Sequence, residues 1–119
     1  TRHMPSQFEE LTATLKAFVD ERDWQQFHTP KNLVMAIAGE VGELTEHFQW
    51  LTQEESLSLP ESKRAEVADE IADVQFYLLL LARGLGIDVP TALTEKLRKN
   101  EEKYPAALVR GSARKYTEY

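Results

Sequence analysis

One eight-residue pattern occurs twice in the chain, with an offset of 30 residues. The first copy, AGEVGELT, covers residues 38–45, and the second, ADEIADVQ, covers residues 68–75. Each copy carries two acidic side chains three positions apart. On an α-helix this spacing places the two carboxylates about 60° apart on one face. The repeat therefore predicts two helices that each present a pair of acids in the same way.

An apolar seam runs beside each acidic pair when the residues are set at helical spacing. The seam residues are Leu33, Ile37, Leu44, Phe48 and Leu51 in the first segment and Val67, Val74, Leu78, Leu81 and Leu85 in the second. If the two helices pack antiparallel through these seams, their four carboxylates converge. Ionised carboxylates held close together repel one another, so such a site needs cations. Hard oxygen ligands suit Mg²⁺, with Mn²⁺ as the alternative.

The size and charge of the chain limit its class. A length of 119 residues suits one domain with a modest core. We expect that domain at residues 4–105, a cloning remnant at residues 1–3 and a tail at residues 106–119. The net charge of −6 argues against general binding to nucleic acid. The chain has no cysteine and no apolar run of membrane-spanning length, so we expect a cytoplasmic protein with no membrane association.

Hydrophobic spacing and capping residues predict an all-α fold of four helices, at about residues 7–22, 30–50, 61–85 and 89–104. Residues 23–30 are expected to form an ordered loop, and residues 52–62 a linker. Gly39 and Gly42 each weaken the second helix by up to ~1 kcal/mol, which predicts close approach of a neighbouring helix. The third helix is apolar nearly all round from Leu78 to Leu81, which predicts a subunit interface.

The double acidic motif, Glu40-x-x-Glu43 followed after 26 residues by Glu70-x-x-Asp73, resembles that of the MazG-like all-α nucleotide pyrophosphohydrolases. Its flanks resemble the dCTP pyrophosphatase branch. The likeness covers nearly the whole chain after Ser6. It includes residues 21–24, 27–28, 39–44, 48–50, 104–105, 110–113 and 115–117.

The resemblance implies a function. It implies hydrolysis of a nucleoside triphosphate to the monophosphate and pyrophosphate, in nucleotide-pool house-cleaning. The favoured substrate is dCTP or a related deoxynucleotide, with dATP and dUTP left open. Base preference is open because Leu15 stands where the animal enzyme has a histidine near the base. The implied fold is a four-helix bundle that assembles into a homodimer or a dimer of dimers, with sites at subunit interfaces.

The resemblance also implies the site residues. The residues that would hold Mg²⁺ and carry the catalysis are Glu40, Glu43, Glu70 and Asp73. One of these acids would accept the proton of the attacking water, and the sequence does not choose which. The residues that would bind substrate are Trp24, Trp50, Tyr77, Lys96, Asn100 and Tyr104. The first three would lie near the base or sugar, and the last three near the phosphates.

Two other functions are compatible with the residues. One is a non-catalytic helical dimer that binds nucleotide and metal, and the other is a helical interaction protein whose acids are solvated. His47, one turn beyond Glu43, is expected at the surface, with metal ligation as the alternative. The tail carries Arg110, Arg114 and Lys115, and we expect it either to be disordered or to lie over a neighbouring site and meet phosphate.

Overall fold

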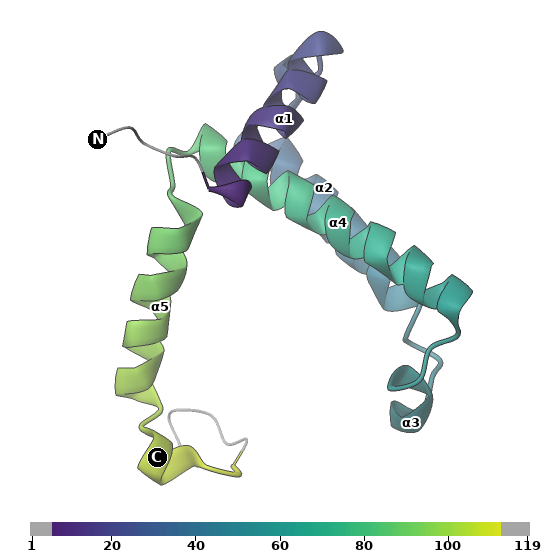
Figure 1. Cartoon of the computed structure of the whole chain (residues 1–119), viewed down its shortest axis with the longest axis vertical. Coiled ribbons are helices and arrows are strands. Elements are labelled where there is room, and N and C mark those ends of the chain that lie inside the picture. Colours follow the sequence, from purple (N-terminus) through teal and green to yellow (C-terminus); the bar gives the residue numbers. More distant parts are fainter. Residues whose placement is uncertain (1–5, 113–119) are drawn as a thin grey trace. The chain divides into compact units, whose positions relative to one another are not determined.

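The computed structural model describes residues 6–112 and is all-helical in that range. The long helices are α1 (Gln7–Glu21), α2 (Pro30–Glu46), α4 (Glu61–Gly84) and α5 (Val89–Lys103), shown in Figure 1. The short ones are the 3₁₀-helix η1 (Gln25–Phe27), α3 (Gln53–Ser56) and α6 (Ala106–Val109). The chain divides after Gly86 into two compact units, the first with α1 to α4 and the second with α5 and α6.

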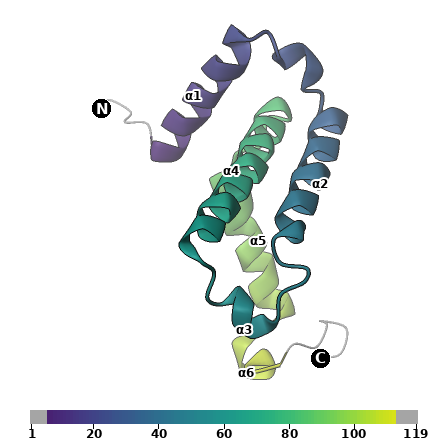
Figure 2. The same cartoon turned by 90° about the vertical axis from the view of Figure 1, so that its right-hand side faces the viewer.

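In the first unit, α2 and α4 lie side by side and run in opposite directions (Figures 1 and 2). Their register is antiparallel, because Glu40 lies near Glu70 while His47, further along α2, lies near Glu66, earlier on α4. α1 packs against α4 as well. The antiparallel pairing on which the predicted convergence of the acids depends is therefore present.

Local capping explains where most of the helices begin and end. Ser6, Thr29 and Asp88 each accept a hydrogen bond through the side chain from the N–H three residues further on, at 3.1 to 3.2 Å. Each such cap stabilises a helix by ~1 kcal/mol. Gly86 follows the end of α4 with a φ of 67°, a left-handed conformation that glycine adopts readily. The predicted starts of α1, α2, α4 and α5 agree with the structure.

The predicted end of the second helix is wrong by one turn. α2 ends at Glu46, and residues 47–50 form turns instead of the helix expected up to Trp50. The backbone there makes shorter-range bonds, such as the one from the N–H of Phe48 to the carbonyl of Thr45 at 3.0 Å. Apolar residues continue at helical spacing through this turn, so the pattern alone carries no sign of the change.

Two further segments contain short helices. The predicted linker at residues 52–62 holds α3, where the side chain of Thr52 and that of Glu55 form a complete capping box. The predicted tail holds α6 in its described part. Arg114 and Lys115, which we expected to be disordered or to meet phosphate, lie outside the described residues.

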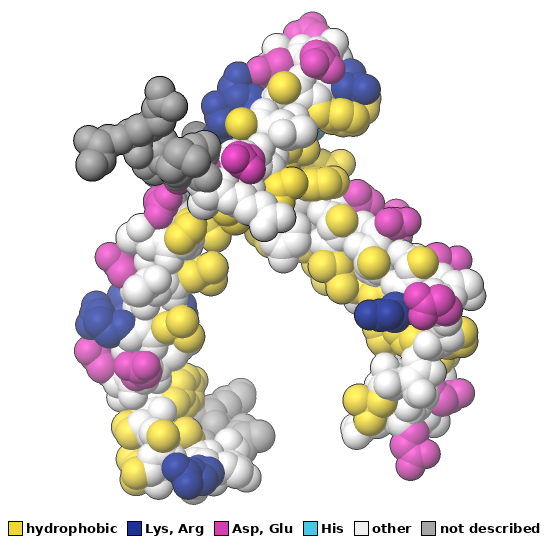
Figure 3. Space-filling model, in the orientation of Figure 1, with side chains coloured by type: hydrophobic (Ala, Val, Ile, Leu, Met, Phe, Trp, Pro, Cys, Tyr) yellow, Lys and Arg dark blue, Asp and Glu magenta, His cyan; other side chains and the backbone are white. Residues whose placement is uncertain are grey.

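Three hydrophobic side chains are buried in the described part of the chain, one from each long helix of the first unit: Val19, Leu33 and Val67. Hydrophobic side chains, drawn yellow in Figure 3, lie instead on the visible surface of the helices. A Cβ atom added to Gly39 or Gly42 would meet nothing within 4 Å. The expected close approach at these glycines is therefore not made by another described helix of the same chain.

None of the described helices is by itself long and apolar enough to cross a membrane, and α4 and α5 reach that length and composition only as a bent pair.

Candidate active site

Three acidic side chains converge between α2 and α4. Carboxylate oxygens of Glu40, Glu43 and Glu70 all lie within 4.8 Å of one another. Glu40 and Glu70 are half-buried, whereas Glu43 is exposed. The acidic spacing on α2 places two of these residues on one face, and the antiparallel register of α4 brings the third to them. We call these three residues the acid cluster.

Ionisation of the acid cluster is unfavourable. The pKa of Glu40 is raised from 4.5 to about 7, and the largest cause is desolvation. Hydrogen bonding with Glu43 and Glu70 and the charges of Glu43 and Asp73 raise the pKa further. The pKa of Glu70 is also raised, chiefly by desolvation and by the charges of Glu43 and Asp73, although its hydrogen bond with Glu40 opposes the shift. A bound cation would lower these pKa values, since it favours the charged carboxylates.

The residues of the acid cluster fit a divalent cation. Oε2 of Glu40 and Oε2 of Glu70 are both buried, and neither finds a hydrogen-bond partner among the described residues. A buried carboxylate oxygen without a partner carries a desolvation penalty that a cation would remove. The donor set consists of carboxylate oxygens, which suits Mg²⁺ or Mn²⁺ better than a metal that prefers nitrogen or sulfur.

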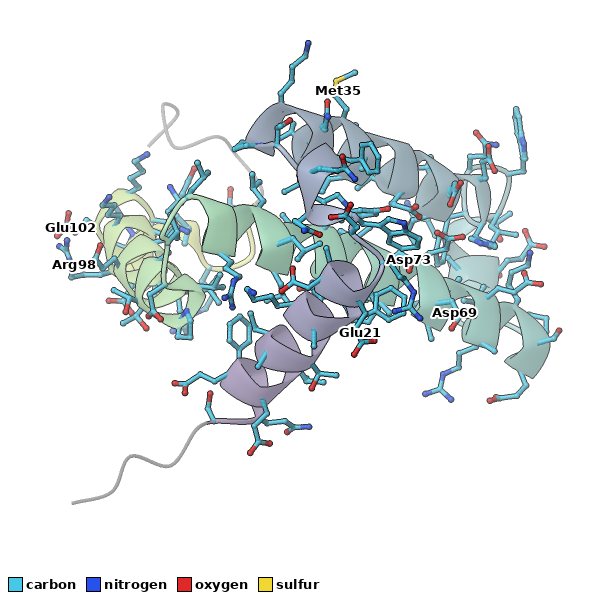
Figure 4. All side chains as sticks on the ribbon, turned by 90° about the horizontal axis from the view of Figure 1, so that it is seen from above. Glu21, Met35, Asp69, Asp73, Arg98 and Glu102 are labelled. Carbon is cyan, nitrogen blue, oxygen red and sulfur yellow. The ribbon has the colours of Figure 1, made fainter. Side chains whose placement is uncertain are left out.

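Asp73 connects the acid cluster to a cavity of about 450 Å³. Its charge acts on both Glu40 and Glu70, and its side chain lines the cavity. Figure 4 labels it on α4, together with the exposed Asp69 nearby on the same helix. Asp73 lies outside the group of oxygens within 4.8 Å, so the structure brings three of the four predicted acids into direct proximity and the fourth beside them.

The cavity is walled by α1, by α4 and by the segment between α1 and α2. Its lining residues are Leu11, Thr14, Leu15, Phe18, Val19, Trp24, His28, Asp73, Phe76, Tyr77 and Leu80. Its size falls within the usual range for small-molecule sites. It is mostly apolar, with a few polar groups at its wall, so it suits a flat, partly polar ring such as a nucleobase.

Two of the six predicted substrate residues, Trp24 and Tyr77, line this cavity, as does Leu15. Sequence reasoning did not select His28 for the site. Its ring stands edge-on to that of Tyr77, with centroids 6.3 Å apart, and its Nδ1 is buried without a partner in the described residues. His28 lies two residues before Pro30, where α2 begins, and the available signal was its place in the family resemblance at residues 27–28.

The other predicted substrate residues lie elsewhere. Trp50 is 87% exposed and is not part of the cavity wall. Trp24 precedes α2 and Trp50 follows it, so the 17 residues of that helix, about 25 Å long, separate the two rings. The remaining three, Lys96, Asn100 and Tyr104, belong to α5 and its C-cap in the second unit.

His47 packs against α4 and is less exposed than expected, at 17% of its side chain. Its Nδ1 lies 3.3 Å from Nζ of Lys63, and its Nε2 lies 4.0 Å from Oε1 of Glu70. A lysine ammonium group can only donate, so Nδ1 accepts and the ring hydrogen is on Nε2, facing Glu70. His47 therefore lies next to Glu70 and is not one of the three converging residues of the acid cluster.

The sequence model of the MazG-like family matches residues 35–119. The chain belongs to the MazG-like family. This MazG-like protein is 48% identical to dCTP pyrophosphatase 1 of Homo sapiens and 47% identical to that of Mus musculus, over 103 residues in each case. These alignments cover 85% of the chain but 61% of each relative, so the chain spans about three fifths of the curated relatives' length.

A solved structure agrees with this assignment. The crystal structure of a pyrophosphatase from Archaeoglobus fulgidus DSM 4304 is similar to the MazG-like chain, with a TM-score of 0.82 and 43% sequence identity. The match covers 88% of this chain and 98% of that protein. The predicted all-α fold and the predicted family are therefore confirmed.

Proposed function

We propose that this MazG-like protein hydrolyses a nucleoside triphosphate to the nucleoside monophosphate and pyrophosphate. The observation that carries the proposal is the acid cluster of Glu40, Glu43 and Glu70 beside a base-sized cavity that shares Asp73 with it. The similarity to dCTP pyrophosphatase 1 supports dCTP or a related deoxynucleotide as the substrate. Clearing such nucleotides from the pool would be its role.

The four acids would hold Mg²⁺, for which Mn²⁺ could substitute. When bound, a divalent ion neutralises charge on phosphate oxygens and increases the acidity of water. The part of Glu40, Glu43, Glu70 and Asp73 is to fix its position next to the cavity. One of the four carboxylates would also accept the proton of the water that attacks the α-phosphorus. The bond from the α-phosphorus to the bridging oxygen would break on the opposite side, and pyrophosphate would leave with that oxygen.

The cavity would hold the base. Trp24 offers an indole face at its wall, and stacking of a base on an aromatic ring is sequence-tolerant. Tyr77 lies one helical turn from Asp73 on α4, so it would meet the sugar or base just beyond the acids. Leu15 forms an apolar part of the wall, and its size and lack of hydrogen bonding would contribute to base preference.

A second copy of the chain would complete the site. On α4 and at its C-cap, Ile71, Leu78 and Leu85 are exposed at seven-residue spacing, which places them on nearly the same face. The predicted seam with α2 therefore leaves Leu78 and Leu85 exposed. An apolar helix face of this kind is typical of a subunit interface. Because Trp50 lies at the far end of α2 from Trp24, it would approach the base from the partner in a dimer or a dimer of dimers.

Three residues of α5 and its C-cap would contact phosphate. The side chains of Lys96, Asn100 and Tyr104 lie at helical spacing on α5 and its C-cap, so they share a side of that helix. A lysine ammonium group and an amide N–H both suit phosphate oxygens.

The predicted domain limits at residues 4 and 105 and the cytoplasmic location remain predictions.

The test is a screen of the common nucleoside and deoxynucleoside triphosphates with Mg²⁺, read out as pyrophosphate and monophosphate. We expect pyrophosphate release, with preference for dCTP, and loss of most of it in Glu70→Gln. The matched control is Asp69→Asn, an exposed neighbour on α4 outside the acid cluster. Release of orthophosphate and diphosphate would contradict the proposed bond, and calorimetric binding without product would favour the non-catalytic module.

A further inference from the structure

α1 ends in a left-handed turn that sets the position of Trp24. Asp23 has a φ of 53°, the one positive value among the described non-glycine residues. The N–H of Asp23 donates to the carbonyl of Asp20, and the N–H of Trp24 donates to that of Val19, each at 3.1 Å. These two bonds form a Schellman motif, in which the residue after the left-handed position packs back on the last turn of the helix. Trp24 and Val19 accordingly line the same cavity.

The side chain of Asp23 ties the following segment to this turn. Its two carboxylate oxygens accept hydrogen bonds from Nε2 of Gln25 and Nε2 of Gln26, each at 3.0 Å. Nε2 of Gln26 also donates to the backbone carbonyl of Asp23, at 2.9 Å. The left-handed conformation is unfavourable for a residue with a Cβ atom, and aspartate is among the few that tolerate it. Asp23, which has this left-handed backbone and makes these hydrogen bonds, directly precedes Trp24 in the chain.

The guanidinium group of Arg22 lies over Phe18 and near Trp24. Its guanidinium carbon lies 3.7 Å from the ring centroid of Phe18 and 6.0 Å from that of Trp24. Its Nη1 donates to the carbonyl of Phe18 at 2.9 Å, which holds the stack to the end of α1. The rings of Phe18 and Trp24 meet edge to face with centroids 5.8 Å apart, and both line the cavity. The planar guanidinium group therefore lies near two aromatic residues of the cavity wall.

We infer that Arg22 and Asp23 are positioning residues that hold Trp24 in place as a wall of the cavity before any ligand enters. Holding the ring in advance removes an ordering cost from ligand binding. The inference rests on the proposed function only for the identity of the ligand, a nucleoside triphosphate whose base stacks on Trp24.

The first test is Arg22→Ala, with Arg22→Lys as the variant that keeps the charge but loses the planar group. Acrylamide quenching of Trp24 is measured without nucleotide in a Trp50→Phe background, and kcat and KM for dCTP are measured in the otherwise native chain. Arg22→Ala should increase quenching and raise KM by about three- to tenfold with kcat within about twofold. Arg22→Lys should fall between Arg22→Ala and the native protein. Arg64→Ala, which removes an exposed arginine of α4, should change neither measurement.

The second test compares Asp23→Gly with Asp23→Ala. Both remove the carboxylate, but only alanine is strained by the left-handed conformation. Asp23→Ala should therefore increase quenching and KM more than Asp23→Gly does. Unchanged quenching in Arg22→Ala and Asp23→Ala, with only a lower melting temperature, would overturn the inference. Quenching needs no turnover, so a native protein that releases no pyrophosphate would refute the proposed function and leave this comparison intact.

Discussion

A carboxylate oxygen of Glu40 on α2 lies within 4.8 Å of one of Glu70 on α4, although 30 residues separate them in the chain. Desolvation and the charges of Glu43 and Asp73 raise the pKa of both residues. Both carboxylates are therefore easier to protonate than free ones when no cation is bound. This relationship makes the stability of the first unit sensitive to both pH and divalent cations.

The stability of the protein is expected to respond to Mg²⁺ through Glu70. Without metal, Glu70→Gln should stabilise the fold, because it removes a carboxylate whose ionisation is disfavoured by desolvation and by the charges of Glu43 and Asp73. Millimolar Mg²⁺ should raise the melting temperature of the native protein, and it should raise the melting temperature of Glu70→Gln much less. Thermal melts in EDTA and in Mg²⁺ measure both effects. In Asp69→Asn, Mg²⁺ should raise the melting temperature as much as in the native protein. An equal rise in Glu70→Gln would exclude Glu70 as a metal ligand.

The metal-free protein is expected to lose stability as the pH rises from 4.5 to about 7. The pKa of Glu40 is higher in the folded state than in the unfolded chain, so the folded state binds the proton more tightly in this window. The loss should level off above pH 7. Urea unfolding at several pH values in EDTA measures it, and Glu40→Gln should reduce the slope, with the raised pKa of Glu70 accounting for the remainder.

Other carboxylates act in a different pH window. Hydrogen bonds at helix starts lower the pKa of Glu55 and of Asp88 below 4.5 and 3.8, so their contribution is lost as the pH falls through those lower values. A stability that rises steadily between pH 5 and 7 in EDTA would contradict the assignment for Glu40.

Two inactive variants are expected to complement each other if Trp50 comes from a second copy. In a mixed dimer of Trp50→Ala and Glu70→Gln chains, one of the two sites has both an intact acid cluster and an intact tryptophan. Random mixing should then restore about a quarter of the native activity, since half of the symmetric dimers are mixed. Pyrophosphate release after refolding the mixed chains measures this. A mixture of Glu40→Gln and Glu70→Gln, with both changes in the acid cluster, should stay inactive.

Self-association is expected to depend on the exposed face of α4. Leu78→Glu places a charge in the middle of the row with Ile71 and Leu85, and it should weaken dimerisation at least about tenfold, equivalent to ~1.4 kcal/mol. Sedimentation equilibrium measures the change. Leu57→Glu, at another exposed leucine outside this row, is the matched control and should leave association unchanged. A native protein that sediments as a monomer at all concentrations would refute the interface.

Much of the local structure could be predicted from the sequence because it depends on near neighbours. The caps at Ser6, Thr29 and Asp88 each join residues three positions apart, and the predicted helix starts agree with the structure. The end of α2 could not be predicted in this way. The turn at residues 47–50 has the same apolar spacing as a helix, so only its backbone hydrogen bonds distinguish it.

The helical class and the pair of acids on one face of each of two helices can be read from the order of residues, because they follow from spacing along one element. The family resemblance can be read in the same way, because it rests on motif residues. The convergence of Glu40, Glu43 and Glu70, the cavity beside Asp73 and the place of Trp24 and Trp50 at opposite ends of α2 are set by how the helices pack. The physical reason is that register and crossing of helices depend on contacts between residues far apart in the chain, about which the periodicity of one helix carries no information.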